Sequence, residues 1–298
     1  MDIYLGKPRG FCAGVVRAIE IAEHSIKKFG SPVYIKHQIV HNPHVVTALE
    51  KKGAITIENV EKIPKGSTVI FSAHGSPPSD YDKAKKRQLK IIDATCPLVT
   101  KVHNEAKKYT KDKRKLILIG HEGHQEVIGT MGHAEVYLID DRIKWTLPKW
   151  PKNQPITIIT QTTLSIDDTM KVVRKITDYF SNVIVRNDLC YATTNRQLAV
   201  KKLCEKSDMI LVIGSPESSN CNRLREVSES HGTPSYLISD ADSLQKIKSK
   251  ISGKIGIISG ASTPELIVQQ IITSLNADEI TEIQVQEENI NFTLPKIK

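Results

Sequence analysis

The sequence predicts an α/β protein made of three similar domains with parallel-type sheets, arranged as a pseudo-threefold trefoil. Three observations predict this fold class: three cysteines that each open a helical pattern, short apolar runs that alternate with these helices, and polar loops that follow the runs. Strands that alternate with helices favour parallel sheets with helices packed on their faces. A chain of 298 residues is long enough for two or three such domains.

The repeat begins at Cys12, Cys96 and Cys190. Each cysteine is followed by a stretch with an apolar or alanine residue every three to four positions, which is the period of a buried helix face. The three stretches are CAGVVRAIEIA, CPLVTKVHNEA and CYATTNRQLAV. They share little identity, so the repeat lies in the order of elements, and we expect a helix to begin just after each cysteine.

Two strand-then-loop segments follow in each repeat. The first set reads VYIKHQIVHNPH, KLILIGHEGHQE and MILVIGSPESSN, and the second reads STVIFSAHGSPPSD, ITIITQTTLSIDD and IGIISGASTPEL. In open α/β sheets, ligands bind beyond the carboxyl ends of the strands, where these polar loops lie. Three domains around a pseudo-threefold axis would bring the three cysteines and the six loops to one centre.

The domain boundaries follow the repeat. We expect a first domain over residues 1–96, a second over 97–190 and a third over 191–280. The last segment, 281–298, has the apolar alternation of an extended edge strand, and we expect it to pack back on the first domain near the central site. Residues 141–156, which carry Pro and Trp, are predicted to be a surface connector within the second domain.

Composition narrows the class of protein. No apolar run approaches the roughly 18 residues needed to span a bilayer, and the N-terminus lacks the apolar core of a secretory signal. We therefore expect a cytoplasmic protein, in which five cysteines favour metal, cluster or core positions over disulfides. The net charge of +9 comes without the aromatic interleaving of nucleic-acid binders, so the charges indicate solvated helix faces that could also attract an acidic partner or an anionic substrate.

The expected centre combines thiols with anion-binding groups. Thiols at helix N-termini have lowered pKa values, and three converging thiolates suit either a zinc ion with an open position or an iron–sulfur cluster. The alternative is that each cysteine is a small buried hydrophobe in its own domain. Hydroxyl, amide and imidazole groups in the loops suit a phosphate or diphosphate. Glu126 is the loop carboxylate best placed to donate a proton.

A family resemblance extends over residues 3–275, nearly the whole chain. The motifs of the 4-hydroxy-3-methylbut-2-enyl diphosphate reductase (LytB) family resemble, in order, FCAGVVRAIEIA, QIVHNPHVV, FSAHGSPP, DATCPLVTKVH, GHEGHQEVIGTMGH, TQTTLS, CYATTNRQ, ESSNCNR and SGASTP. The resemblance implies the last enzyme of the non-mevalonate isoprenoid pathway. Such an enzyme removes the 4-hydroxyl of its allylic diphosphate substrate reductively and yields isopentenyl and dimethylallyl diphosphate.

The resemblance also implies roles for single residues. Cys12, Cys96 and Cys190 would bind three irons of one 4Fe–4S cluster and leave the fourth iron open to the substrate hydroxyl. Glu126 and Thr162 would be catalytic, the first by delivering protons and the second by positioning the hydroxyl and the proton path. The substrate-binding set would be His41, His74, His124, Thr162, Ser218, Ser219, Asn220 and Ser262. An acidic ferredoxin or flavodoxin would supply electrons to a monomeric enzyme, with no role for nucleic acid or membrane.

Two alternatives keep the fold but change the activity: a cluster-bearing regulator that does not catalyse, and a zinc hydrolase with three cysteine ligands.

The other two cysteines are expected to lie outside the site. Cys204 fits a core helix position, and Cys221 stands where the family commonly has serine. A fourth thiolate would block the open iron, so we do not expect Cys221 to be a ligand.

Overall fold

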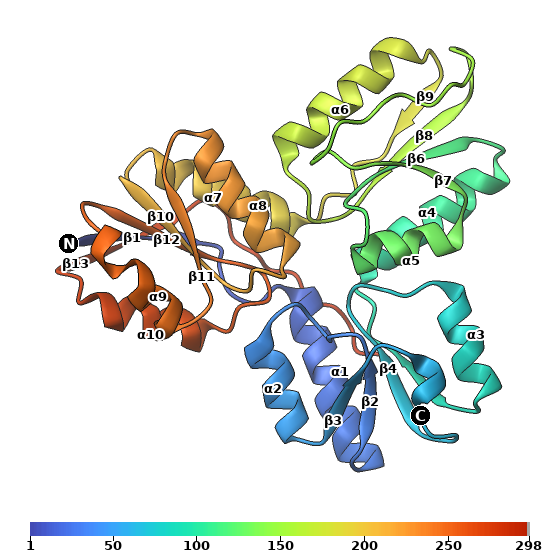
Figure 1. The fold of residues 1–298 in the computed structure, drawn as a ribbon, viewed down its shortest axis with the longest axis horizontal. Helices are drawn as coiled ribbons and strands as arrows, with labels where there is room; N and C mark the ends of the chain where they lie inside the picture. Colours follow the sequence, from blue (N-terminus) through green and yellow to red (C-terminus); the bar gives the residue numbers. More distant parts are fainter. Residues whose placement is uncertain (297–298) are drawn as a thin grey trace. The chain divides into compact units, whose positions relative to one another are not determined.

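The computed structural model describes residues 1–296, and within this range the strands form three parallel sheets (Figure 1). The chain divides into two compact units. The first unit contains Met1–Val16, His41–Val45 and Cys190–Asn291, and the second contains Arg17–Val40, Val46–Leu189 and, of the described residues, 292–296. The first unit holds one sheet and the second holds two.

The sheet of the first unit has the strand order β11-β10-β12-β1-β13, and every neighbouring pair is parallel. Its strands are β1 (Asp2–Lys7), β10 (Met209–Ile213), β11 (Ser235–Ile238), β12 (Ile255–Ser259) and β13 (Glu279–Gln284). The helices of this part of the chain are α7 (Tyr191–Cys204), α8 (Ser219–Ser230), α9 (Ala241–Ile247), η2 (Lys248–Lys250) and α10 (Glu265–Leu275). The central strands β10 and β12 are buried along their whole length, as is usual when helices cover both faces of a parallel sheet.

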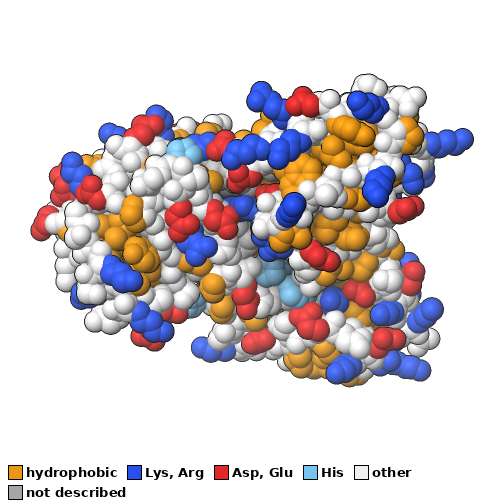
Figure 2. Space-filling view, turned by 45° about the horizontal axis from the view of Figure 1, so that its top comes forward, with side chains coloured by type: hydrophobic (Ala, Val, Ile, Leu, Met, Phe, Trp, Pro, Cys, Tyr) orange, Lys and Arg blue, Asp and Glu red, His pale blue; other side chains and the backbone are white. Residues whose placement is uncertain are grey.

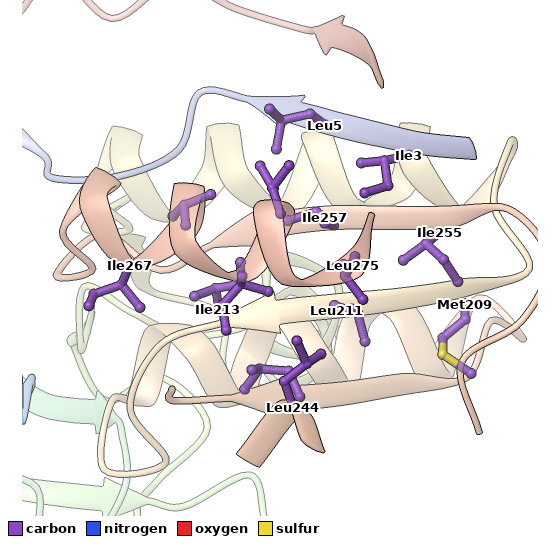
Figure 3. Packing of buried hydrophobic residues seen from close by; sticks show 14 residues of the cluster. Ile3, Leu5, Met209, Leu211, Ile213, Leu244, Ile255, Ile257, Ile267 and Leu275 are labelled. Carbon is purple, nitrogen blue, oxygen red and sulfur yellow. The ribbon is translucent and has the colours of Figure 1, made fainter. Parts of the chain in front are cut away.

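One hydrophobic core lies between this sheet and α10. Figure 3 shows Leu275 of α10 close to Leu211 of β10 and Ile257 of β12, and Ile267, at the other end of α10, on the side of Ile213. Ile3 of β1 belongs to the same cluster, so the first strand of the chain is part of the core of this unit.

The second unit holds two four-stranded parallel sheets with the orders β3-β2-β4-β5 and β7-β6-β8-β9. The strands are β2 (Val33–Lys36), β3 (Ala54–Ile57), β4 (Thr68–Phe71), β5 (Lys90–Asp93), β6 (Lys115–Ile119), β7 (Val136–Ile139), β8 (Ile156–Thr160) and β9 (Val183–Val185). The helices of the first 190 residues are α1 (Ala13–Phe29), α2 (Pro43–Lys51), η1 (Val60–Lys62), α3 (Pro78–Lys86), α4 (Pro97–Lys111), α5 (Gln125–His133) and α6 (Ile166–Tyr179).

The predicted fold class, three α/β domains with parallel sheets, is confirmed. Helices α1, α4 and α7 begin at the residue after Cys12, Cys96 and Cys190, respectively. All six polar loops directly follow strands, in the order β2, β4, β6, β8, β10 and β12. The order of cysteine, helix, strand and loop that repeats in the sequence therefore repeats in the structure.

The ends of the chain differ from the predicted division. Asp2–Lys7 pairs with β12 in the sheet of residues 209–284, not with the strands of the expected first domain, 1–96. The physical reason is the repeat itself. In the other two sheets, the strand that precedes the cysteine lies beside the second central strand, and β1 takes that place beside β12. The remaining domain boundaries stay a prediction.

The last segment forms an edge strand, β13, which pairs in parallel with β1. Farther along, the backbone oxygen of Thr293 accepts a hydrogen bond of 3.1 Å from Nε of Arg17 on α1. The tail therefore contacts Arg17, which belongs to the expected first domain. Ile297 and Lys298, the last two residues of the expected segment, lie outside the described residues. The connector 141–156 links β7 to β8 without a helix, and its Trp145 and Trp150 pack against the core of their sheet.

Glycines allow close packing within the second unit. Gly132 of α5 lies so close to Pro77 that a Cβ atom at position 132 would stand 2.9 Å from Cα of Pro77 and would also meet its Cβ. Gly75 has a φ of +78°, and a Cβ there would meet the His103 ring. These contacts join the loop after β4 to helices α4 and α5.

Substitution of Gly132 tests this packing. We expect Gly132→Ala to lower the free energy of unfolding by about 1–3 kcal/mol, because the added methyl group overpacks a backbone contact that cannot rotate away. The measurement is the unfolding transition followed by circular dichroism. Met131→Ala is the matched control, since Met131 is exposed on the same helix. Equal stability of the two variants would contradict the prediction.

Candidate active site

Two of the three predicted cluster ligands lie in the first unit. Cys190 is the N-cap of α7, and its Sγ accepts a hydrogen bond from the backbone N–H of Thr193 at 3.4 Å. Cys12 immediately precedes α1, and its backbone N–H donates to the oxygen of Ala261 at 3.1 Å. The two cysteine segments touch, because the N–H of Ala13 donates to the hydroxyl oxygen of Tyr191 at 3.1 Å.

The third predicted ligand, Cys96, lies in the second unit as the N-cap of α4. Its backbone N–H donates to the oxygen of Ala73 at 3.0 Å, which ties it to the loop after β4. Among the described residues, Cys12, Cys96 and Cys190 form no disulfide, and each is partly exposed. The positive end of a helix dipole favours the thiolate, the form that binds iron or zinc, so this donor set fits metal ligation.

The other two cysteines have different surroundings. Cys221 is fully buried, and its Sγ packs against the backbone of Gly214 and Gly260 so closely that neither glycine has room for a Cβ. Burial raises the pKa of the Cys221 thiol, which favours the neutral form over the thiolate. Cys204 packs at the edge of the same hydrophobic cluster, 3.7 Å from the hydroxyl of Ser228. Both environments are those of core residues.

The first unit also contains the start of α8. Ser218 is the N-cap, and its Oγ accepts from the N–H of Cys221 at 3.4 Å. Ser219 and Asn220 form the first turn and are buried. Both polar atoms of the Asn220 amide are buried without a partner among residues 1–296. Leaving such an amide unpaired costs free energy, so its position at a helix N-terminus is suited to an anionic ligand that would pair with it.

The loop after β12 connects several of these residues. Ser262 donates from its hydroxyl to the backbone oxygen of His41 at 3.2 Å, and Ala261 accepts from the N–H of Cys12. A Cβ at Gly260 would stand 3.5 Å from Nδ2 of Asn220. The first unit therefore brings His41, the start of α8 and Ser262 together with Cys12.

In the second unit, Glu126 and Thr162 form a buried pair. Oε1 of Glu126 accepts from the N–H of Thr162 at 2.7 Å, and Oε2 accepts from the Thr162 hydroxyl at 2.9 Å. Burial is the largest influence and raises the pKa of Glu126 to about 7, although both hydrogen bonds from Thr162 act to lower it. A carboxyl group with this pKa is suited to release a proton near neutral pH.

Two histidines lie next to this pair. His124 is the N-cap of α5, and its Nδ1 accepts from the N–H of Glu126 at 3.2 Å, so a neutral His124 carries its proton on Nε2. The His74 ring lies edge-on to the His124 ring, with 6.1 Å between their centroids. Four predicted site residues from the loops after β4, β6 and β8 are thus close together in the second unit.

His37 also lies beside these residues, although its sequence pattern did not indicate a site role. Its ring centroid lies 5.8 Å from that of His74, and its Nδ1 lies 2.9 Å from a carboxylate oxygen of Glu58. His37 has a φ of +61°, which is uncommon for a residue other than glycine. It directly follows β2, so its place at the carboxyl end of a strand is the signal that could have identified it.

The sequence and the fold match one family of proteins. The family model described as LytB protein matches residues 3–276. A 4-hydroxy-3-methylbut-2-enyl diphosphate reductase of Pseudomonas aeruginosa is 47% identical over 307 residues, which cover 99% of this chain and 98% of the relative. A relative of the same name from Acinetobacter baumannii is 46% identical, with coverage of 99% and 97%.

Solved structures give the same result. The E-1-hydroxy-2-methyl-but-2-enyl-4-diphosphate reductase of Plasmodium falciparum is 39% identical and superposes with a TM-score of 0.91, covering 99% of this chain and 95% of its own. A structure of (E)-4-hydroxy-3-methyl-but-2-enyl diphosphate reductase, the terminal enzyme of the non-mevalonate pathway, is 35% identical with a TM-score of 0.66. It covers 91% of this chain and 98% of its own. Within the described part of the chain, no helix has the length and apolar character to cross a membrane.

The buried Glu126 predicts a pH-dependent stability. Its pKa rises on folding from the ordinary 4.5 to about 7, so between these values the native state binds more protons than the unfolded state. This difference lowers the stability of the native protein as the pH rises through that window. Glu126→Gln removes the effect, so relative to the unsubstituted protein the variant should gain about 3 kcal/mol between pH 4.5 and 7. Denaturant unfolding at several pH values measures this gain, and a stability difference that is constant with pH would refute the assignment.

Proposed function

Because the chain belongs to the LytB protein family, we propose that it is a 4-hydroxy-3-methylbut-2-enyl diphosphate reductase. In this reaction the C–O bond of the allylic 4-hydroxyl breaks, and two electrons and two protons are consumed. One proton leaves with the hydroxyl as water and the other forms the new C–H bond, which gives isopentenyl or dimethylallyl diphosphate. The observation that carries the proposal is the buried Glu126–Thr162 pair. It is a carboxyl group with a raised pKa beside two histidines, in a chain similar to these reductases over nearly its whole length.

We propose that Cys12, Cys96 and Cys190 hold one 4Fe–4S cluster and leave one iron without a protein ligand. The support is chemical: these thiols form no disulfide within the described residues, are partly exposed and lie at helix starts, whereas Cys221 is buried and its raised pKa favours the neutral thiol. When bound, such a cluster supplies single electrons and an open iron that acts as a Lewis acid toward the substrate hydroxyl. The proposal requires the three cysteines to meet at one centre, as the pseudo-threefold repeat predicts.

The diphosphate of the substrate needs donors of hydrogen bonds and positive potential. The proposed set is His41, His74, His124, Ser218, Ser219, Asn220 and Ser262. The N-terminus of α8 offers the positive end of a helix dipole, and the buried Asn220 amide has a donor and an acceptor to pair. Binding through several directed donors fixes the orientation of the substrate.

Glu126 and Thr162 are the proposed catalytic pair. With a pKa of about 7, Glu126 carries its proton in a large share of molecules at neutral pH and can deliver it to the departing hydroxyl. The Thr162 backbone and hydroxyl hold both carboxyl oxygens, which fixes the direction of transfer. The imidazole of His124 binds the backbone N–H of Glu126 and so orients the start of α5.

The proposed partners are the allylic diphosphate and a small acidic electron donor, a ferredoxin or a flavodoxin, with the enzyme acting as a monomer in the cytoplasm. The net charge of +9 favours docking of an acidic protein. On the face seen in Figure 2, Lys and Arg side chains are interspersed with Asp and Glu. This mixture differs from the continuous basic stripe that nucleic-acid binding would require.

Removal of single cysteines tests the cofactor and the reaction together. After anaerobic reconstitution, we expect the unsubstituted protein to contain iron and sulfide and to consume the allylic diphosphate with a low-potential reductant. Cys12→Ser, Cys96→Ser and Cys190→Ser should each lose most of the iron and the turnover. Cys204→Ser and Cys221→Ser are the controls and should keep both. A protein that binds zinc and hydrolyses phosphate esters, or that binds iron without turnover, would refute the reductase.

The proton role of Glu126 is tested by rate against pH. Glu126→Gln should keep its iron and lose roughly 10²–10⁴-fold in kcat, because the amide cannot donate an acidic proton. In Thr162→Ala, loss of a hydrogen bond that stabilises the carboxylate should raise the pKa of Glu126 further. The rate, which falls as the pH rises through about 7, should then fall at a higher pH in the variant. If the fall in rate occurs at the same pH in Thr162→Ala as in the unsubstituted protein, Glu126 is not the proton donor.

A further inference from the structure

Helix α7, whose N-cap is Cys190, also contacts the segment around Cys12. The hydroxyl oxygen of Tyr191 accepts from the N–H of Ala13, and Nη2 of Arg196 donates to the backbone oxygen of Gly10 at 2.9 Å. These two contacts lie on either side of Cys12.

Arg196 is fully buried, which is unusual for a charged side chain. Its Nη1 donates to the oxygen of Ala192 at 3.0 Å and to both carboxylate oxygens of Glu288, at 3.0 and 3.3 Å. Asn195 also donates to Glu288, at 3.1 Å. One guanidinium group therefore joins α7, the segment before Cys12 and the chain that follows β13.

This arrangement differs from an ordinary stabilising ion pair. On the same helix, Lys202 and Glu205 form an exposed pair in which both side chains are more than half exposed. Such a pair adds little stability and joins residues that are only three positions apart in the chain. A buried guanidinium, in contrast, is costly unless every partner is present, so it strongly favours the arrangement in which Gly10 and Glu288 are both in contact. The planar fork of arginine can reach both partners, which the single ammonium group of lysine cannot do.

We propose that Arg196 is a positioning residue that fixes Cys12 relative to Cys190, with Glu288 as its counter-ion, so that this buried pair sets how firmly a cluster is held and at what potential it is reduced. The inference rests on the proposed function, since it assigns Cys12 and Cys190 as ligands. Substitution of a residue that supports a metal ligand commonly weakens metal binding. Fixed charges near a cluster shift its reduction potential.

The two charges should act in opposite directions. A carboxylate near a cluster disfavours the added electron, and a guanidinium favours it. Glu288→Gln, which keeps the shape and hydrogen-bonding oxygen of the side chain, should therefore raise the midpoint potential. Arg196→Gln should lower it. Arg196→Lys keeps the charge but loses the fork, so its potential should stay near that of the unsubstituted protein.

Retention of iron is the second measurement. In the anaerobically reconstituted full chain, Arg196→Gln and Arg196→Lys should lose iron to a chelator roughly 10–100-fold faster than the unsubstituted protein, because Cys12 is no longer fixed. Glu205→Gln, on the exposed pair of the same helix, is the matched control and should change neither potential nor iron loss. Both measurements are independent of turnover.

The outcomes separate the inference from the proposed function. If the unsubstituted protein assembles a cluster but Glu288→Gln and Arg196→Gln shift its potential in the same direction, or leave potential and iron loss unchanged, Arg196 only stabilises the fold and the inference is wrong. If Arg196→Gln does not fold, two other results test the inference. It is wrong if Glu288→Gln does not raise the midpoint potential and Arg196→Lys does not lose iron faster than the unsubstituted protein. An unsubstituted protein that assembles no iron–sulfur cluster refutes the proposed function, and the inference with it.

Discussion

Parallel strand pairing is the constraint on which the candidate site depends, because it sends the carboxyl end of every strand in a sheet to the same edge. Each polar loop follows a strand at that edge, and the next helix then begins with unpaired N–H groups and a positive dipole end. Cys96, Cys190, His124 and Ser218 are all N-caps of such helices. The same backbone geometry therefore positions the proposed cluster ligands, the Glu126 carboxyl group and the proposed diphosphate-binding residues.

Buried polar groups give the site its chemistry, and the fold accommodates each in a different way. Glu126 is stabilised by two hydrogen bonds from one threonine, which leaves a carboxyl group that titrates near neutral pH. Arg196 is neutralised by a carboxylate 92 positions away in the chain. The Asn220 amide has no partner among residues 1–296, which is an unfavourable state that a ligand would relieve. The polar groups that cost the fold stability when buried are therefore also groups of the candidate site.

Five cysteines with identical side chains differ in reactivity because their surroundings differ. A helix N-terminus and partial exposure favour the thiolate that binds metal, and Cys96 and Cys190, two of the proposed cluster ligands, have both features. Between two glycine backbones, with no access to water, the Cys221 thiol has a raised pKa and fills space. Loop composition alone would have grouped Cys221 with the polar residues before it, and its burial assigns it to the core.

The sequence by itself determined the repeat, the helix starts after Cys12, Cys96 and Cys190, the loops that carry the site and the family, because periodicity and motifs are local properties of the chain. Only the tertiary structure decided that β1 completes the sheet of the last domain, that His37 lies beside His74, and that Arg196 contacts both Gly10 and Glu288. Strand order and buried charge pairs depend on contacts between distant segments. A parallel strand has the same local pattern whichever sheet it joins, so its place is set by hydrogen bonding and burial in the folded chain.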